Sequence, residues 1–375
     1  MKRAFIVLLC CYASVNILAQ AENNQITIGV NHTIKSSVLD QDRTIQIYVP
    51  DSYNDSDQSY PVLYILDGQW FFENGIAIQK SLRTPRAIPE MIVVGIKNSN
   101  PLRNTLFGEE SNKFTDFLKN EVIHFLDSNY RTNEERVIFG WQNAAFYISE
   151  IFLIEKDLFS GAIISAGGHA SEEDVKEYSP AKNTYLYIAN SKRDIYTISY
   201  SDALSEVLKK NSPENLRWKY ELFNDEVHET IAHLALYKGI KYYYHNYDGL
   251  VFESIQSFAD AGGITYLNSY FKERTIRFGK DVKIENKTKN GLIWLTLNRD
   301  NFEYFSLFMK EFKDVLSTER YASAYWQNRF GQFYLKHKDY HNAHKYFNAG
   351  LTLYPDTNLE TEMAQGLSTA NSMLK

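Results

Sequence analysis

The chain has 375 residues, 44% of them hydrophobic, and a formal net charge of −6 at pH 7. This length allows one large or two moderate domains with hydrophobic cores of their own. The excess of acidic residues argues against a nucleic-acid partner, for which a basic face would be expected.

The N-terminus has the pattern of a secretory signal peptide. Lys2 and Arg3 precede the apolar run Ala4–Ala13, and Ala19-Gln20-Ala21 supplies the small residues of a cleavage site. The apolar run is shorter than the roughly 20 residues of a membrane-spanning helix. We therefore expect cleavage after Ala21, no transmembrane segment in the mature chain, and a secreted or periplasmic protein. Both cysteines of the chain lie in this segment, so no disulfide is expected.

The following residues predict an α/β domain. Alternating or β-branched runs at Ile26–Val30 and Thr44–Val49 indicate paired antiparallel strands. Further strands are predicted at Pro61–Leu66, Met91–Ile96, Val137–Phe139, Gly161–Ser165, Thr184–Ala189 and Trp218–Phe223. Helical spacing occurs at 114–126, after Asn143, and at 201–210 and 230–243. This alternation implies a mostly parallel central sheet with helices on both faces.

One stretch carries the chemical information. An apolar strand reaches Gly140, and a helical pattern begins directly after Asn143. Strand, sharp turn and helix are the context of the nucleophile elbow of α/β-hydrolases, G-x-S-x-G. In this chain Gln142 occupies the position of the serine. A carboxamide offers no proton to a neighbouring base, so it cannot form the covalent acyl intermediate of a serine esterase.

The C-terminal third is predicted to be helical. Five residues fall at the offsets of a tetratricopeptide repeat: Gly331, Tyr334, Ala343, Phe347 and Pro355. One repeat cannot bury its own apolar face, so we expect neighbouring helices at Leu292–Leu316 and Leu359–Leu374. The predicted organisation is a signal peptide (1–21), an α/β-hydrolase domain (22–248) and a helical tetratricopeptide-like region (249–375).

These motifs resemble the secreted putative-esterase family of α/β-hydrolases, which includes enzymes for enterochelin-type esters and small acyl esters. The resemblance runs over Thr44–Tyr243. Its segments are Tyr64–Gly68, Ile92–Asn98 with Arg103, Val137–Gly140, Leu158–Ser165, and His228 with Leu234–Tyr237. Some bacterial members carry a helical, tetratricopeptide-like tail, which the C-terminal region resembles.

The resemblance implies a catalytic triad in the order nucleophile, acid, histidine. These three positions fall on Gln142, Asp194 and His228, and the oxyanion donors fall on the backbone amides of Gln69 and Asn143. Active members usually have His before the nucleophile and glycines after it. This chain instead has Trp141, Ala144 and Ala145, so it departs from the family pattern at several positions of one turn.

The favoured interpretation is an exported pseudo-esterase that keeps the fold, lacks the nucleophile, and binds an acyl-ester-like ligand or a partner. A second interpretation is an active carboxylic-ester hydrolase that uses a non-standard nucleophile or water activated by His228. Ser165 and His169 lie nearer to a plausible cleft than Ser149, which is about 10 Å along the elbow helix. A third interpretation is a protein-docking module that acts through the helical tail.

No metal or cofactor motif is apparent. His337, His341 and His344 have a spacing like that of metal ligands, but the predicted turn at Asp339 separates the first from the other two. We therefore expect neither a metal ion nor a cofactor.

Overall fold

The computed structural model describes residues 26–99 and 102–375, so the predicted signal peptide lies outside the described residues. Eight strands form one sheet in the order β1-β2-β4-β3-β5-β6-β7-β8. The bounds are β1 (Val30–Ser36), β2 (Gln41–Tyr48), β3 (Tyr60–Leu66), β4 (Ile92–Ile96), β5 (Thr132–Trp141), β6 (Gly161–Ser165), β7 (Thr184–Ser191) and β8 (Leu216–Phe223). Strand β2 pairs antiparallel with β1 and β4, and all other pairs are parallel. The predicted α/β fold with a mostly parallel sheet is confirmed.

The first strand begins later than predicted. Residues 26–29 are outside any strand, and β1 pairs Val30 with Ile47 and Ser36 with Gln41. The apolar pattern of Ile26–Val30 therefore indicated a strand where no strand partner lies opposite, and Ile26 is exposed. The interpretation of this range as a strand was wrong except at its last residue.

The central strands are apolar throughout because both faces of the sheet are covered. In β3, Val62, Tyr64 and Leu66 join the core on one face, while Leu63 and Ile65 join the core on the other. Successive side chains of a strand point to opposite faces, so a strand with helices on both sides needs apolar residues at every position.

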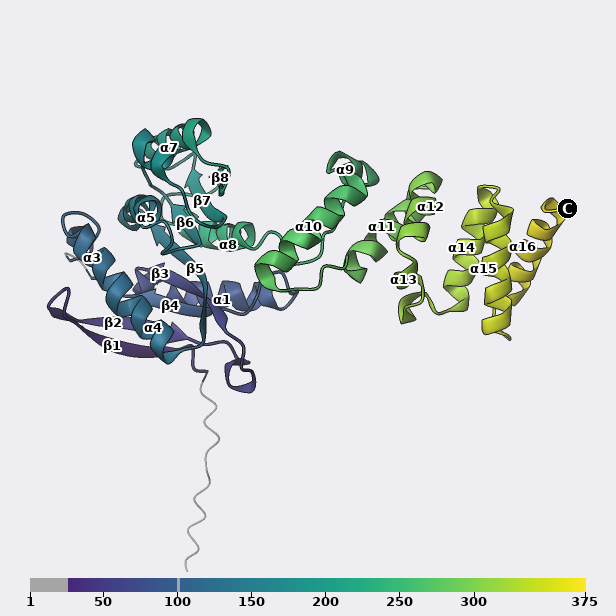
Figure 1. The fold of residues 1–375 in the computed structure, drawn as a ribbon, viewed down its shortest axis with the longest axis horizontal. Coiled ribbons are helices and arrows are strands. Elements are labelled where there is room, and N and C mark those ends of the chain that lie inside the picture. The colour runs from purple at the N-terminus through teal and green to yellow at the C-terminus, as the bar shows by residue number, and fades with distance from the viewer. Residues whose placement is uncertain (1–25, 100–101) are drawn as a thin grey trace, which may run out of the picture.

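Eight helices and a π-helical segment belong to this sheet-containing part (Figure 1). They are α1 (Gly68–Arg83), α2 (Leu102–Leu106), α3 (Ser111–Phe117), the π-helical Leu118–Ile123, α4 (His124–Asn129), α5 (Asn143–Ile154), α6 (Glu172–Glu177), α7 (Ile198–Asn211) and α8 (Ile231–Tyr243). Helices α1 and α8 cover one face, and α3, α5 and α7 cover the other. Helix α1 is not among the sequence predictions.

The remaining chain is helical, and in Figure 1 its helices extend as a row away from the sheet, with the C-terminus at the far end. The bounds are α9 (Ile255–Asp260), α10 (Gly263–Phe278), α11 (Asn286–Asn298), α12 (Phe302–Glu311), α13 (Lys313–Leu316), α14 (Ala324–Lys336), α15 (Tyr340–Leu353) and α16 (Glu360–Met373). Short 3-10 turns lie at Tyr53–Asp55 and Glu319–Tyr321. The helical region has a hydrophobic core of its own, which runs from Ile255 to Ala370.

The helices at Leu292–Leu316 and Leu359–Leu374 are present as α11–α13 and α16. Gly331 of α14 lies against the Phe347 ring of α15, where an added Cβ would approach ring atoms to 2.7 Å. This close contact gives a physical reason for glycine at that offset. The tetratricopeptide identity of the region and the domain boundary at 248/249 stay predictions.

The C-terminal end of α10 connects the two parts. The Arg277 guanidinium donates to the Glu135 carboxylate at 2.9 Å and to the Tyr243 carbonyl at 2.8 Å. It also lies over the rings of Tyr185 and Tyr243, 4.3 and 4.4 Å from their centroids. Among the described residues, no helix combines the length and apolar character that crossing a membrane requires.

Candidate active site

The elbow between β5 and α5 has the sharp geometry of a nucleophile turn. Gln142 has φ 56° and ψ −118°, a sparsely populated positive-φ conformation that costs a non-glycine residue about 1–3 kcal/mol. Its amide donates to the Ser165 carbonyl at 2.9 Å, and its carbonyl accepts from the Ala145 amide at 2.8 Å. These bonds to the neighbouring strand β6 and to the first turn of α5 hold the strained residue in place.

Gly140 allows strand and helix to approach closely at this turn. An added Cβ would come within 2.6 Å of the Ile148 side chain and 2.8 Å of the Ala144 Cβ. A side chain at position 140 would therefore push α5 away from β5 and reshape the turn that carries Gln142.

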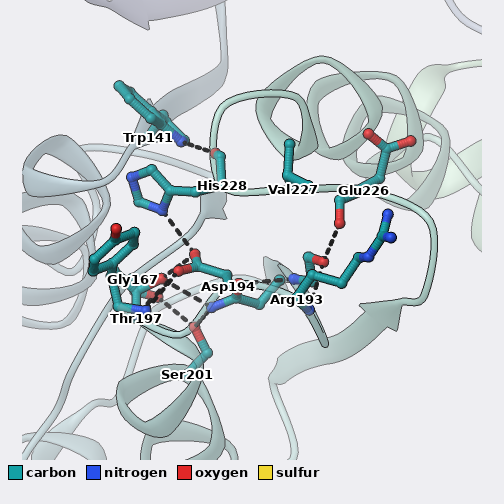
Figure 2. Close-up of polar contacts among 12 residues, drawn as sticks. Trp141, Gly167, Arg193, Asp194, Thr197, Ser201, Glu226, Val227 and His228 are labelled. Carbon is teal, nitrogen blue, oxygen red and sulfur yellow. Dashed lines mark hydrogen bonds and ion pairs between the residues drawn. The ribbon is translucent and has the colours of Figure 1, made fainter.

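The structure brings the predicted acid and base together at the ends of β7 and β8 (Figure 2). The Nδ1 atom of His228 lies 2.8 Å from Oδ2 of Asp194. The Asp194 side chain is fully buried, while the His228 side chain keeps 11% exposure. The histidine can therefore reach solvent or a ligand through the edge of its ring, while the acid cannot.

Asp194 is held as a carboxylate by several donors. The Thr197 hydroxyl donates to Oδ2 at 2.6 Å, and the amides of Tyr196 and Thr197 donate to Oδ1 at 3.0 and 3.2 Å. Burial alone would raise the pKa of Asp194. The hydrogen bonds from Thr197, His228 and the Tyr196 amide outweigh burial and hold this pKa below its usual value.

Trp141 fixes the loop of the histidine. Its indole Nε1 donates to the His228 carbonyl at 2.9 Å, and the two rings lie 5.0 Å apart between centroids. The Trp141 carbonyl accepts from Arg103 at 3.1 Å. Arg103 is in turn buried in an ion pair with Asp67, at 2.8 Å. Trp141 thus has a structural role in positioning His228.

The two predicted oxyanion donors lie at the N-termini of two helices. Asn143 is the first residue of α5, and Gln69 is the second residue of α1. These helices follow β5 and β3, which are neighbours in the sheet, so both helix starts lie at the same sheet edge. Amides in the first turn of a helix have no partner within the helix and favour negative charge.

The side chains of these two residues are engaged elsewhere. The Gln69 side chain exchanges two hydrogen bonds with the backbone of Asn98, at 2.5 and 3.0 Å. The Asn143 side-chain amide donates to the Asn104 side-chain oxygen at 2.8 Å. The backbone amides, which lack partners within their helices, remain the predicted contacts for a ligand's oxygen.

The alternative nucleophiles are poorly placed. The Ser165 side chain is fully buried, and its hydroxyl has no hydrogen-bond partner among the described residues. Ser149 is also buried; its hydroxyl donates to the Phe146 carbonyl and accepts from the His169 amide. Neither hydroxyl is available to a substrate in this conformation.

Exposed aromatic rings lie next to the paired Asp194 and His228. Tyr196 is 69% exposed, with its ring 5.6 Å from that of His228, and Trp70 is 49% exposed, with its ring 6.2 Å from that of Trp141. A cavity of about 390 Å³ is lined by Gln69, Trp70 and residues of β2 and the segment after β4, but not by Gln142, Asp194 or His228. Its size is in the range of small-molecule sites.

The three histidines with metal-like spacing do not form a cluster. His337 ends α14, stacks on Phe302 at 4.6 Å and bonds to Asp300 at 2.8 Å, whereas His341 and His344 belong to α15. In the part of the chain that the structure describes, no group of three or more His, Cys, Asp or Glu side chains is arranged to hold a metal ion.

Two contributors to the site were missed in the sequence. Thr197 supplies the shortest bond to Asp194, and Ser191 donates to the Glu226 carbonyl at 2.5 Å, which joins the acid loop to the histidine loop. The Asp-x-x-Thr spacing, which lets a carboxylate bond the first turn of the following helix, could have indicated Thr197.

Comparison with known proteins assigns the chain to a family. The family model described as "Putative esterase" matches residues 36–260. The uncharacterized protein YbbA of Bacillus subtilis (strain 168) is 25% identical over 150 residues, which are 36% of this chain. The chain therefore spans only 60% of the length of that curated relative.

Two solved structures show the same fold at low sequence identity. The IroE-like serine hydrolase from Shewanella oneidensis is 22% identical, with a TM-score of 0.55 over 75% of this chain and 98% of its own. An uncharacterised protein from Capnocytophaga ochracea DSM 7271 is 16% identical, with a TM-score of 0.58 over 92% of this chain and 99% of its own. The second similarity extends into the helical region. Since the family model matches more than half of the chain, the protein belongs to the putative-esterase family of α/β-hydrolase-fold proteins.

Proposed function

We propose that this protein is an exported, catalytically impaired member of the esterase family that uses the former active site to bind an acyl-ester-like ligand. The observation that supports the proposal is Gln142 in a nucleophile-elbow conformation, at the sheet edge where Asp194 and His228 are paired. The export part rests on the signal pattern of residues 1–21 and is tested by sequencing the N-terminus of the exported protein, which should begin at Glu22.

The chemistry of the site favours binding over turnover. In a serine esterase, the histidine removes the serine proton while two amides stabilise the oxyanion. Here His228 has no hydroxyl to activate at position 142, although the amides of Gln69 and Asn143 remain at the sheet edge. Loss of the triad serine typically leaves only about 10³–10⁴-fold acceleration over water, from the oxyanion hole and binding.

The surroundings favour a ligand with an apolar or planar group. Exposed Tyr196 lies beside His228 and exposed Trp70 lies beside Trp141. A cavity of about 390 Å³ on the Gln69 and Trp70 side has room for a small molecule, although Gln142, Asp194 and His228 do not line it. Aromatic rings contribute contact area without many rotatable bonds, so they suit a binding site.

The direct test is an ester-hydrolysis assay of the purified mature protein with p-nitrophenyl acyl esters, combined with a covalent serine-hydrolase probe. We expect no probe labelling and turnover at most about 10³–10⁴-fold above the uncatalysed reaction. Titration with a non-hydrolysable ester analogue should quench Trp70 and Trp141 fluorescence in a saturable way, and Trp70→Ala should weaken this binding.

Two variants separate the alternatives. Turnover that disappears with Ser165→Ala would support a rescued nucleophile, and turnover that survives this change but disappears with His228→Ala would support activated water. Either result would contradict the impaired-enzyme proposal. A protein that neither hydrolyses nor binds ester analogues would contradict the ligand-binding part.

Docking of a protein partner through the helical tail is a second candidate function. Trp294 of α11 and Tyr325 of α14 are exposed, and the Arg329 guanidinium lies 4.8 and 5.8 Å from their ring centroids. Trp, Tyr and Arg concentrate binding energy at protein interfaces. A co-purifying partner that is lost from the Trp294→Ser protein, with unchanged melting, would support docking; retention of that partner would contradict it.

A further inference from the structure

A second cavity lies where the helical region meets the sheet-containing part, away from the elbow. It has a volume of about 620 Å³. Its walls come from Arg86 after α1, from Asp248 after α8, from the end of α10 and the following loop, and from the start of α11, with Asp314 of α13. The volume falls within the range of small-molecule sites.

The walls of this junction cavity are rich in cations, although the whole chain is acidic. Six basic side chains line it: Arg86, Arg274, Lys280, Lys283, Lys287 and Lys289. Four carboxylates face them: Asp248, Asp281, Glu285 and Asp314. The cavity therefore carries an excess of positive charge.

Three of the cations are already neutralised by ion pairs. Arg274 bonds to Glu285, Lys289 bonds to Asp314, and Lys287 lies 2.5 Å from Asp248. Because these pairs occupy three of the four carboxylates, only Asp281 remains to balance Arg86, Lys280 and Lys283. Among the described residues, none of these three cations forms an ion pair with a carboxylate.

Lys280 is the most constrained of the unpaired cations. Its ammonium donates to the Tyr247 carbonyl at 3.0 Å and lies 3.2 Å from the centroid of the Tyr247 ring. The pKa of Lys280 is lowered to about 8, chiefly by burial and also by the charges of Arg274 and Arg86, while Glu285 and Asp248 oppose the shift. An anion in the cavity would relieve this crowding of like charges.

The N-terminus of helix α11 adds an electrostatic potential that favours an anion in the cavity. The helix is 13 residues long, its N-terminal residue Asn286 lines the cavity, and its first turn contains no acidic residue. The preceding Glu285 makes no side-chain cap and instead bonds to Arg274. The partial positive charge of a helix N-terminus favours anions, here in addition to the unpaired side chains.

We propose that this junction cavity is a binding site for a small oxyanion of the phosphate type, with Arg86, Lys280 and Lys283 as its principal ligands. Guanidinium and ammonium groups donate several charge-assisted hydrogen bonds to phosphate oxygens. The occupant bridges Arg86 of the sheet-containing part and the α10–α11 loop of the helical region. Binding would therefore strengthen the connection between the two.

Calorimetric titration of the full mature chain with inorganic phosphate and pyrophosphate, at matched ionic strength with chloride, tests the site. We expect saturable binding, tighter for pyrophosphate, and a rise in Tm that follows the occupancy. The double variant Arg86→Ala/Lys283→Ala removes two exposed cations without touching the core, and it should raise Kd at least about tenfold.

A matched control separates the site from general salt effects, because phosphate stabilises many proteins through exclusion from their surfaces. Lys272→Ala/Lys313→Ala removes the same number of charges from exposed positions of α10 and α13 outside the cavity. This protein should bind as wild type does. The absence of saturable heat in the wild-type protein, or equal Kd values for the two double variants, would overturn the proposal.

Discussion

At the residue scale, Gln142 keeps a strained backbone although its carboxamide cannot act as a nucleophile. The strain of about 1–3 kcal/mol should be removed by Gln142→Gly, since glycine adopts positive φ freely. The greater freedom of glycine in the unfolded chain opposes the gain by about 0.4–1 kcal/mol. We expect Gln142→Gly to exceed Gln142→Ala in free energy of unfolding by about 1 kcal/mol in urea denaturation. Equal stability of the two variants would mean that the strain is no larger than the opposing unfolded-chain effect of about 0.4–1 kcal/mol.

Restoring a hydroxyl at this position tests whether the site still has catalytic geometry. Gln142→Ser should give covalent labelling by a serine probe and weak acyl-ester turnover, because the elbow is sharp and His228 is already paired with Asp194. Trp141 should be left in place, since its indole holds the His228 carbonyl. The double variant Gln142→Ser/His228→Ala is the control and should lose both signals. A natively folded Gln142→Ser protein that neither labels nor turns over would mean that the nucleophile position lies out of reach of His228.

The depressed pKa of Asp194 predicts a pH-dependent contribution to stability. A carboxyl whose pKa is lower in the folded state stabilises the protein above its unfolded pKa of about 3.9. This contribution is lost as pH falls through the folded pKa. Asp194→Asn should therefore reduce the free energy of unfolding at pH 7, and its difference from wild type should shrink below about pH 4. The exposed Asp57→Asn serves as control, and a difference that stays constant down to pH 3 would contradict the prediction.

At the element scale, the sequence predicted those strands and turns that depend on residues close together in the chain. The apolar runs of β3 and β4 predicted buried strands, and Gly140 followed by a helical pattern predicted the elbow. The exact ends of elements that pair with distant parts of the chain could not be predicted in this way. Strand β1 needs β2 opposite it, which shifted the strand to Val30–Ser36. The pairing of Asp194 with His228 depends on loops after two different strands, β7 and β8, which the sequence places only through the family resemblance.

Helix α10 shows how one side chain can connect two parts of a chain. Arg277 is largely buried, with its ion pair to Glu135 and its bond to the Tyr243 carbonyl. Arg277→Met should lower the free energy of unfolding by up to about 3 kcal/mol, because it leaves the partly buried Glu135 carboxylate and the Tyr243 carbonyl without this donor. The other ion pair from α10 to the sheet, Arg217 with Glu273 at 3.5 Å, is more exposed. Arg217→Met should therefore cost less than about 1 kcal/mol. Similar losses for the two variants in urea denaturation would contradict this assignment.

At the scale of the whole molecule, the two parts differ in how they are built. The sheet-containing part has cores on both faces of its sheet, and the helical region has a third core that runs from α9 to α16. The end of α10 nevertheless packs on the first part, because Phe278 lies against Tyr244 and Tyr247. Stability of the sheet-containing part should therefore depend on residues beyond the predicted boundary at 248/249.

A mature chain that ends at Asp248 tests this dependence. It would lose Arg277 and Phe278, leave Glu135 without its partner, and uncover the rings of Tyr243 and Tyr244, which are now buried. Exposure of this apolar surface should lower Tm by several degrees and promote association. Far-UV and near-UV circular dichroism during heating would measure both the melting and the loss of aromatic packing. Arg277→Met in the full-length chain should reproduce part of the decrease, since it removes the same anchor while the helical region stays in place. An unchanged melting curve for the truncated chain would mean that the contacts of α10 do not stabilise the sheet-containing part. The predicted boundary at 248/249 would then mark the end of an independently stable unit.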